Sequence, residues 1–243
     1  MDNLMTTAVA LLASETRQVE TAAQNIANLA TPGYKRLITF GDAVSQATAE
    51  TRPAAPRAGA KAPAPNIATD FTPGRMIHTG NPLDLALASD GFFTVATPDG
   101  IAYLRGGSFR LDAEGRLVTR EGWKLQGSGG GDVVVRSTNW HVQADGTVLD
   151  DGQPVAVIGA TAFANPAKLT RVGEGLYRAD GAQPVERQDP RVLQGYLEAS
   201  NVANGDEMVR MMAAMRRIES GQKLVHAYDD MMGTALQRLG DMS

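Results

Sequence analysis

Apolar and small side chains recur at alternating steps of four and three residues along the start of the chain. The pattern runs through Met5, Val9, Leu12, Thr16, Val19, Ala23, Ile26 and Ala30, in which Thr16 is the one polar member. Such a heptad seam is typical of a helix that packs against a partner along its length. We predict a helix over residues 3–30. It should end at Thr31-Pro32-Gly33, because proline disfavours helical geometry in the residue before it and glycine frees the turn that follows.

The same period returns over residues 205–240, which we predict to form a second helix roughly 50 Å long. Its ten seam positions are Met208, Met211, Met215, Ile218, Gln222, Val225, Asp229, Met232, Leu236 and Leu239, and all but Gln222 and Asp229 are apolar. Burying eight side chains yields roughly 16 kcal/mol, whereas ordering the helix costs on the order of 1 kcal/mol or more per residue. The helix therefore needs a partner along its length, and we expect the two terminal helices to pair as a coiled-coil core.

Pairing of the two helices still leaves four large side chains to be covered from another side, namely Met212, Leu224, Tyr228 and Met231. A second layer of helices from other subunits would cover them, and methionine suits such a surface because its flexible thioether fits several packings. The alternative is that these are ordinary core residues of a monomeric bundle. The pattern alone leaves both interpretations open.

Between the predicted helices the chain changes to short apolar runs separated by turns. Asp90-Gly91 and Pro98-Asp99-Gly100 are turn sequences typical of β-hairpins. The runs cover residues 84–88, 92–96, 101–104, 108–111, 116–119, 133–135, 145–148 and 155–158. Because no helical segment separates them, they favour an antiparallel sandwich or barrel, with Phe92, Phe93 and Phe109 in its core. The predicted fold class is α+β: a central antiparallel β-sandwich or barrel-like domain with long N- and C-terminal helices.

Four parts follow from these patterns. They are an N-terminal helix (1–35), an extended Ala/Pro-rich linker (36–69), a β-rich outer domain (70–195) and a C-terminal helix (196–243). Within the linker, residues 45–66 consist largely of Ala, Pro, Thr and Arg, and their apolar residues follow no helical or strand period. The segment could instead fill gaps between neighbouring molecules, with Arg52, Arg57 and Lys61 meeting acidic surfaces.

Composition narrows the class of protein. The 243 residues carry 23 basic and 27 acidic side chains, a net charge of −4, and no basic tract that would suggest a nucleic-acid partner. The absence of cysteine excludes a disulfide framework, a thiolate metal site and a cysteine nucleophile. The apolar run from Ala8 to Ala13 is far shorter than the ~20 residues of a membrane span. The start Met1-Asp2-Asn3 lacks the basic region of a cleavable signal, so we expect a soluble protein without one.

The sequence offers no constellation of catalytic or metal-binding groups. Residues 127–131 are Gly-rich but lack the Lys-Ser/Thr of a phosphate loop, so a hairpin loop is the better interpretation. Asp112 and Glu114 suggest a calcium loop, but Arg116 stands where a further oxygen ligand should be. The three histidines lie in separate segments without the spacing of a metal site: His78, His141 and His226. We predict a protein that is not an enzyme and that holds no cofactor and no metal.

Four segments of the chain resemble the flagellar rod and hook protein family. At the N-terminal end, residues 24–35 contain an Asn-x-x-Asn helix end followed by Thr-x-Gly and an aromatic; at the C-terminal end, residues 197–202 and 207–212 resemble the second signature. Residues 80–93 and 107–119 are similar to the family's core domain. These segments occur in the family's order over nearly the whole chain. Two positions depart from the pattern: Gln24-Asn25 replaces the usual Asn-Asn, and Ser220-Gly221 places a helix-weakening glycine mid-helix, where it could mark a local bend.

This resemblance implies a structural subunit of the bacterial flagellar basal-body rod, the periplasm-spanning axial drive shaft. The implied partners are copies of the chain itself, other proximal rod subunits, the distal rod and the flagellar type III export apparatus, which would explain export without a cleavable signal. The family polymerises into a hollow tube with paired end helices inside and the β domain outward. The chain is too short for a typical hook subunit, so the resemblance favours the proximal rod, with the distal rod as the alternative.

Polymerisation into a tube requires head-to-tail contacts with a rotation that does not close. Helices that order only on assembly would keep the free chain from polymerising early; circular dichroism and proteolysis of the purified monomer would test this. The residues expected to carry assembly are Met5, Val9, Leu12, Val19, Asn25, Ile26, Asn28, Thr31, Pro32, Gly33, Tyr34, Leu197, Glu198, Ser200, Asn201, Val202, Met208, Met211, Met215, Ile218, Val225, Met232, Leu236 and Leu239.

Other interpretations remain at this stage. Asn25 and Asn28 could simply cap and end a helix. A coiled-coil trafficking or adhesion module would share the terminal heptads but not the Thr-Pro-Gly-Tyr and Ser-Asn-Val sequences. A non-flagellar β-domain binding module with coiled-coil tails would show a pocket lined by convergent polar groups and would stay monomeric.

Overall fold

The computed structural model describes residues 2–39, 67–173, 175–187 and 190–240. The chain forms two compact units. Among the described residues, a helical unit comprises 2–27, 37–39, 67–68 and 202–240, and a strand unit comprises 28–36, 69–173, 175–187 and 190–201. The Ala/Pro-rich segment 45–66, for which the sequence predicts a linker, lies outside the described residues.

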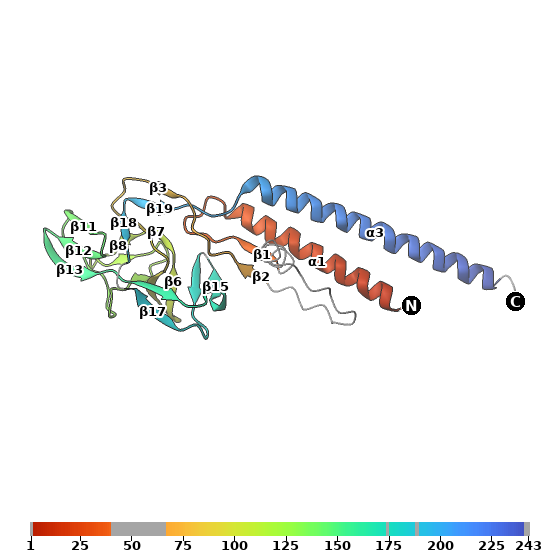
Figure 1. The fold of residues 1–243 in the computed structure, drawn as a ribbon, viewed down its shortest axis with the longest axis horizontal. Coiled ribbons are helices and arrows are strands. Elements are labelled where there is room, and N and C mark those ends of the chain that lie inside the picture. Colours follow the sequence, from red (N-terminus) through yellow and green to blue (C-terminus); the bar gives the residue numbers. More distant parts are fainter. Residues whose placement is uncertain (1, 40–66, 174, 188–189, 241–243) are drawn as a thin grey trace, which may run out of the picture. The chain divides into compact units, whose positions relative to one another are not determined.

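Two long helices lie side by side in the helical unit (Figure 1). Helix α1 spans Asp2–Ala27 and helix α3 spans Asn204–Gly240, so they are about 39 and 55 Å long at 1.5 Å per residue. The second helix agrees with its predicted range. Helix α1 ends three residues before the predicted end, because residues 28–31 form a turn in which Thr31 N donates to Asn28 O (3.1 Å).

The strand unit contains a seven-stranded sheet in the order β15-β16-β6-β5-β10-β9-β8 (Figure 1). In that order its strands are Thr170–Gly173, Leu176–Arg178, Gly100–Leu104, Phe93–Thr97, Lys124–Leu125, Leu117–Val118 and Arg110–Leu111. All pairings of adjacent strands in this sheet are antiparallel. The predicted antiparallel architecture is therefore confirmed for this sheet.

Smaller sheets account for the remaining strands. One has the order β11-β12-β13 (Trp140–Val142, Thr147–Asp150, Gln153–Val157), and another β18-β4-β7 (Val192–Gln194, Asp84–Leu87, Gly106–Ser108). The two-stranded sheets pair β14 (Ala160–Phe163) with β17 (Pro184–Arg187), β19 (Tyr196–Glu198) with β3 (Met76–His78), and β1 (Leu37–Thr39) with β2 (Ile67–Thr69). A 3₁₀ turn, η1, covers Pro166–Lys168. The strands described do not close into a barrel, which corrects that part of the predicted fold class.

Two apolar clusters form the core of the strand unit. The larger one includes Leu85, Phe93 and Leu125, all fully buried, and Phe109 meets Phe93 edge-on with ring centroids 6.2 Å apart. The second is aromatic and places Phe92 against Tyr177 at 5.6 Å. The core role predicted for Phe92, Phe93 and Phe109 is confirmed.

The Asp-Gly turns differ in outcome. Asp99-Gly100 joins β5 to β6 as the predicted hairpin. Asp90-Gly91 does not form one: β4 pairs with β18 and β7, whereas β5 pairs with β6 and β10. The carbonyl of Gly91 accepts a hydrogen bond from Arg105 Nη1 (2.5 Å), and the chain passes here from one sheet to another.

The run 133–135 is not a strand, which corrects a second prediction. Val134 makes only an isolated bridge to Arg116, while Val133 and Val135 are buried in the larger cluster. The backbone of this run still bonds to the large sheet, because Val133 N donates to Leu125 O (3.1 Å) and Val133 O accepts from Leu117 N (3.0 Å), but the bonds do not form a regular strand.

Candidate functional site

Small side chains lie where the two long helices meet. Ala22 and Ala214 are 3% and 0% exposed. Gly221 is buried beside Leu12, and a Cβ at Gly221 would lie 2.9 Å from Leu12 Cδ2. This glycine therefore permits a close approach of the helices, and α3 continues through it to Gly240.

The less exposed residues of α3 recur at heptad spacing, as predicted. Half of these residues are the predicted seam residues, and the other half each lie one position earlier in the sequence. The less exposed positions on α3 are Arg210, Ala213 and, at heptad spacing, Glu207, Met211, Ala214, Ile218, Gly221, Val225, Tyr228 and Met232. On α1 they include Ala8, Leu12, Glu15, Val19, Ala22 and Ile26. Close approach favours the small residues, so the larger Met208 and Met215 lie beside the contact, 46% and 43% exposed.

A buried polar cluster lies in the helical unit near the end of α1. Asn25 Nδ2 donates to Leu37 O (2.8 Å) and to Glu207 Oε2 (3.1 Å), and its Oδ1 accepts from Leu37 N (2.8 Å). Asn25 and Glu207 are 0% and 2% exposed. The Asn25 amide thus satisfies a strand backbone and a carboxylate at once, a use that the cap interpretation did not include. Nearer the middle of α1, Glu15 pairs with Arg217 (3.2 Å).

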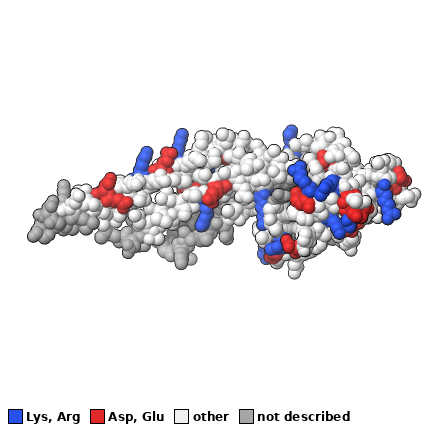
Figure 2. All heavy atoms as spheres, turned by 180° about the vertical axis from the view of Figure 1, so that it is seen from behind, with Lys and Arg blue, Asp and Glu red and all other residues white. Residues whose placement is uncertain are grey.

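Many large apolar side chains of both helices remain exposed in the single chain. Those more than a third exposed are Met5, Val9, Leu11, Met208, Val209, Met212, Met215, Leu224 and Met231. Leu12, Val19, Ile26, Met211, Ile218, Val225 and Met232 are half-buried, while the side chains of Leu236 and Leu239 lie outside the described part of the structure. On the face drawn in Figure 2, charged side chains are sparse over the helices and denser over the strand unit.

An apolar groove follows the start of α1 and the second half of α3. It is lined mainly by Met5, Ala8, Leu11, Leu224, Tyr228 and Met231. Its floor is continuous with the α1–α3 contact, because Ala8 and Val225 belong to both.

The Thr-Pro-Gly-Tyr sequence forms a turn in the strand unit. Thr31 Oγ1 donates to Asn28 Oδ1 (3.3 Å), and Gly33 has a φ of +69°, which glycine adopts without strain. Gly33 N donates to Glu198 O (2.7 Å). Tyr34 is fully buried, with the Arg171 guanidinium 4.2 Å from its ring centroid.

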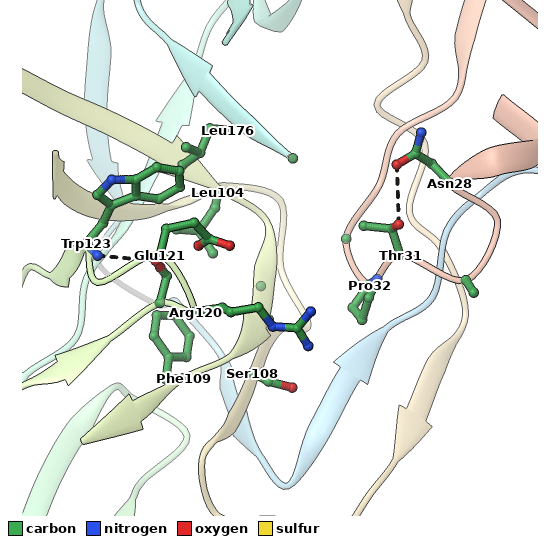
Figure 3. A pocket seen from close by; sticks show the side chains of 16 residues that line it. Asn28, Thr31, Pro32, Leu104, Ser108, Phe109, Arg120, Glu121, Trp123 and Leu176 are labelled. Carbon is green, nitrogen blue, oxygen red and sulfur yellow. Dashed lines mark hydrogen bonds between the residues drawn. The ribbon is translucent and has the colours of Figure 1, made fainter. Parts of the chain in front are cut away.

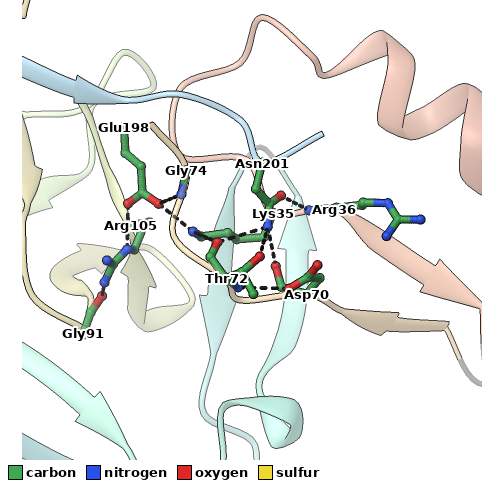
Figure 4. A network of polar contacts seen from close by, with 9 residues as sticks. All are labelled: Lys35, Arg36, Asp70, Thr72, Gly74, Gly91, Arg105, Glu198 and Asn201. Atoms are coloured by element: carbon green, nitrogen blue, oxygen red, sulfur yellow. Dashed lines mark hydrogen bonds and ion pairs between the residues drawn. The ribbon is translucent and has the colours of Figure 1, made fainter. Parts of the chain in front are cut away.

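Glu198 is the centre of a buried charged network (Figure 4). Its Oε1 accepts from Lys35 Nζ (2.6 Å) and Gly74 N (2.7 Å), and its Oε2 accepts from Arg105 Nε (2.7 Å). The three charged side chains are 0%, 1% and 5% exposed for Glu198, Lys35 and Arg105. Burial lowers the pKa of Lys35 below its ordinary value, and the bond to Glu198 opposes that shift.

This network ties together four segments that are distant in sequence. Gly74 has no room for a side chain, because a Cβ there would overlap Ala199 O. Nearby, Asn201 Oδ1 accepts from Arg36 N (2.7 Å), and its Nδ2 donates to Asp70 O (2.9 Å). Leu197 and Ser200 are half-buried and Val202 is buried. The sequence pattern singled out Glu198 and Asn201, but Arg105 carries no signal that would have marked it.

A pocket of the strand unit lies beside the Thr31 turn (Figure 3). Thr31 and Pro32 form one side of it, and Arg120, Trp123 and Leu176 lie on the other. Its lining includes no histidine, and Thr31 Oγ1 donates to Asn28 Oδ1 within it.

The other candidate motifs have structural roles. Asp112 accepts from Glu114 N and Arg116 N and pairs with Arg116 Nε (2.6 Å), so its oxygens are engaged within the loop. Residues 127–131 form a turn closed by Gly127 N donating to Gly131 O (2.9 Å). Over the described ranges, no group of three His, Asp or Glu side chains could hold a metal ion. In the same ranges, no helix combines the length and apolarity that crossing a membrane requires.

Comparisons with known proteins identify relatives of the whole chain. The family described as flagellar basal body rod FlgEFG protein C-terminal matches residues 193–238, and the flagellar hook protein FlgE/F/G D1 domain matches residues 86–150. The flagellar basal-body rod protein FlgF of Escherichia coli K12 is 33% identical, covering 98% of this chain and 99% of the relative.

Two further relatives show the range of similarity. FlgF of Caulobacter vibrioides is 30% identical over the whole of both chains. The flagellar basal-body rod protein FlgG of Bacillus subtilis 168 is 32% identical, covering 88% of this chain and 90% of the relative. The chain is thus similar along its length to two kinds of rod protein.

Proposed function

The chain belongs to the flagellar basal-body rod protein family and is a structural subunit of the rod, and from this premise we propose that it polymerises through its terminal helices as a proximal rod subunit. The family is structural and not one of enzymes, and its location is the flagellar basal body. Rod proteins assemble with other axial proteins of the flagellum. We further propose that the chain reaches this site through the flagellar export apparatus without a cleavable signal.

The observation that supports polymerisation through the helices is the exposed apolar surface of the helical unit. Met208, Met212 and Leu224 are 46%, 49% and 71% exposed. Burying such side chains is worth about 1.5–3 kcal/mol each. Because the α1–α3 contact uses the small residues, these larger ones remain available to neighbouring subunits. Supercoiled pairing of α1 and α3 in the assembled rod is part of the same proposal.

Coverage supports the proximal rod over the distal rod. Both FlgF relatives described above align with at least 98% of this chain, whereas the FlgG relative aligns with 88%. We assign the proximal position to the FlgF type, and the FlgG type, the distal rod, is the second candidate because its identity is similar.

The test is incorporation into basal bodies. In a strain that lacks its own copy of the gene, the wild-type chain should restore swimming and copurify with basal bodies. Met208→Glu and Met212→Glu together should abolish both, because they place carboxylates on the surface to be buried. The matched control, Asp206→Asn, changes an exposed side chain of the same helix that lies about 160° around from Met208 and about 120° from Met212, and it should incorporate normally. Normal incorporation of the double variant would contradict assembly through this surface.

Complementation separates the two rod positions. The chain should restore swimming to a strain lacking its FlgF-type subunit and should not restore it to a strain lacking its FlgG-type subunit. The opposite result would place the chain in the distal rod.

A further inference from the structure

Two apolar surfaces lie on opposite sides of α3. The first, the methionine ridge, consists of Met208, Met212 and Met215, which are 43–49% exposed and follow the i, i+4, i+7 spacing of one helix face. The second is the apolar groove lined mainly by Met5, Ala8, Leu11, Leu224, Tyr228 and Met231. One surface projects from a single helix, and the other is a hollow between two.

Helix geometry fixes how these surfaces are related. Successive residues turn by about 100° and rise 1.5 Å, so Tyr228 lies about 160° around α3 from Met212 and about 24 Å further along it. A two-fold dimer joins a patch to the same patch of its partner, whereas two different patches on opposite sides join copies head to tail. The arrangement in this chain is of the second kind.

The groove suits a ridge of methionine side chains. It is open and almost wholly apolar, with Leu224 71% and Met231 64% exposed, and it prolongs the α1–α3 contact through Ala8 and Val225. A helix that presents side chains at i, i+4 and i+7 is the kind of partner that such grooves accept. Methionine adapts to the irregular floor that Tyr228 and the small Ala8 create.

We infer that the methionine ridge of one copy of this chain seats in the apolar groove of the next copy, so that the contact is heterologous and repeats along the assembly. This inference rests on the proposed function, which supplies the neighbouring copies, and adds which face meets which. Each copy then offers one ridge and one groove, and no copy uses both on the same partner.

Cysteine cross-linking tests the pairing directly, because the natural sequence contains no cysteine. Three variants are expressed in place of the native chain: Met212→Cys, Leu224→Cys and the double variant with both. Basal bodies are purified, oxidised and separated under non-reducing conditions. The double variant should give a ladder of dimers and larger covalent multimers, because each copy links to two neighbours. Neither single variant should give a dimer.

A matched double variant controls for chance collisions. The control variant carries Met212→Cys and Lys223→Cys, so its second cysteine stands at the exposed position 223 instead of 224. Position 223 lies about 100° away from Leu224 around the helix. It should give no ladder.

The outcomes separate this inference from the proposed function. Dimers from either single variant, or no multimer from the double variant in basal bodies that contain it, would overturn the ridge-in-groove pairing while leaving the rod function intact. Absence of the wild-type chain from basal bodies would overturn both.

Discussion

The strand unit and the helical unit differ in what they leave exposed. In the strand unit, large side chains such as Phe93, Leu117 and Leu125 are fully buried among one another, and even the charges of Lys35 and Glu198 are satisfied inside. In the helical unit the buried contact uses Ala22, Ala214 and Gly221, while methionines and leucines face outward. A domain that is stable alone buries most of its large apolar side chains. The exposed methionines and leucines of the helical unit are therefore typical of a surface that binds another molecule.

The largest effect is expected at Glu198. Glu198→Gln would leave Lys35 and Arg105 buried without their counter-charge, and breaking a buried ion pair in this way costs about 3–5 kcal/mol. Urea unfolding followed by tryptophan fluorescence measures this, because both tryptophans, Trp123 and Trp140, lie in the strand unit.

The control for Glu198 is Asp112→Asn. Asp112 pairs with Arg116 at the surface, where solvent screens the ion pair and leaves it a small contribution to stability. If Glu198→Gln destabilised the strand unit no more than this control does, the buried network would contribute little to the stability of the strand unit.

The next effect concerns alkaline pH. Burial raises the pKa of Tyr177 to about 12 from an ordinary value of 10.0. The folded state therefore keeps a proton that the unfolded state loses, so this contribution to stability is complete below pH 10 and falls as the pH rises toward 12. Two pKa units correspond to about 2.7 kcal/mol.

Tyr177→Phe should remove the part of the alkaline loss of stability that comes from ionisation of Tyr177. The variant's free energy of unfolding should fall less than that of the wild-type chain between pH 10 and 12, measured by tryptophan fluorescence in urea. Val157→Thr, at an exposed position of the strand unit, should keep the wild-type profile because it changes no ionisable group. An unchanged pH dependence in Tyr177→Phe would contradict the buried, neutral phenol.

A smaller effect is expected in the helical unit. Asn25→Ala leaves the backbone N–H and C=O of Leu37 and the carboxylate of Glu207 without the Asn25 amide, which costs about 1–3 kcal/mol. Helix unfolding followed by circular dichroism at 222 nm is the measurement. Ser14→Ala, at an exposed position of the same helix, is the control, and equal losses in the two variants would show that the Asn25 contacts contribute little.

The smallest effect on the isolated chain is expected at the exposed surface. Met212→Gln should change the free energy of unfolding by no more than about 0.5 kcal/mol, because an exposed side chain contributes little to its own fold. The same variant should reduce incorporation into basal bodies. A large loss of stability without any assembly defect would mean that Met212 belongs to the core of a monomeric bundle, the alternative that the sequence left open.

The helical period predicted the elements better than their contacts. The pattern of Met208, Met211 and Met215 located α3 to within a residue at its start, because periodicity depends on local geometry alone. It misplaced half of the seam, since the choice between Met215 and Ala214 as the contact residue depends on how closely α1 approaches. The sequence marked the glycine at position 221 only as a possible bend, whereas the structure places it against Leu12, where a Cβ would lie 2.9 Å from Leu12 Cδ2.

By itself, the sequence determined the order of helix, strands and helix, the antiparallel turns such as Asp99-Gly100, and the signatures that place the chain among rod proteins. These features depend on residues that are close together in the sequence, so the order of residues is enough to predict them. Only the tertiary structure decided that Lys35, Arg105 and Glu198 meet in one buried network and that Asn25 reaches both Leu37 and Glu207. Such contacts join residues up to 182 positions apart, and their energy comes from shared burial, which no local pattern records.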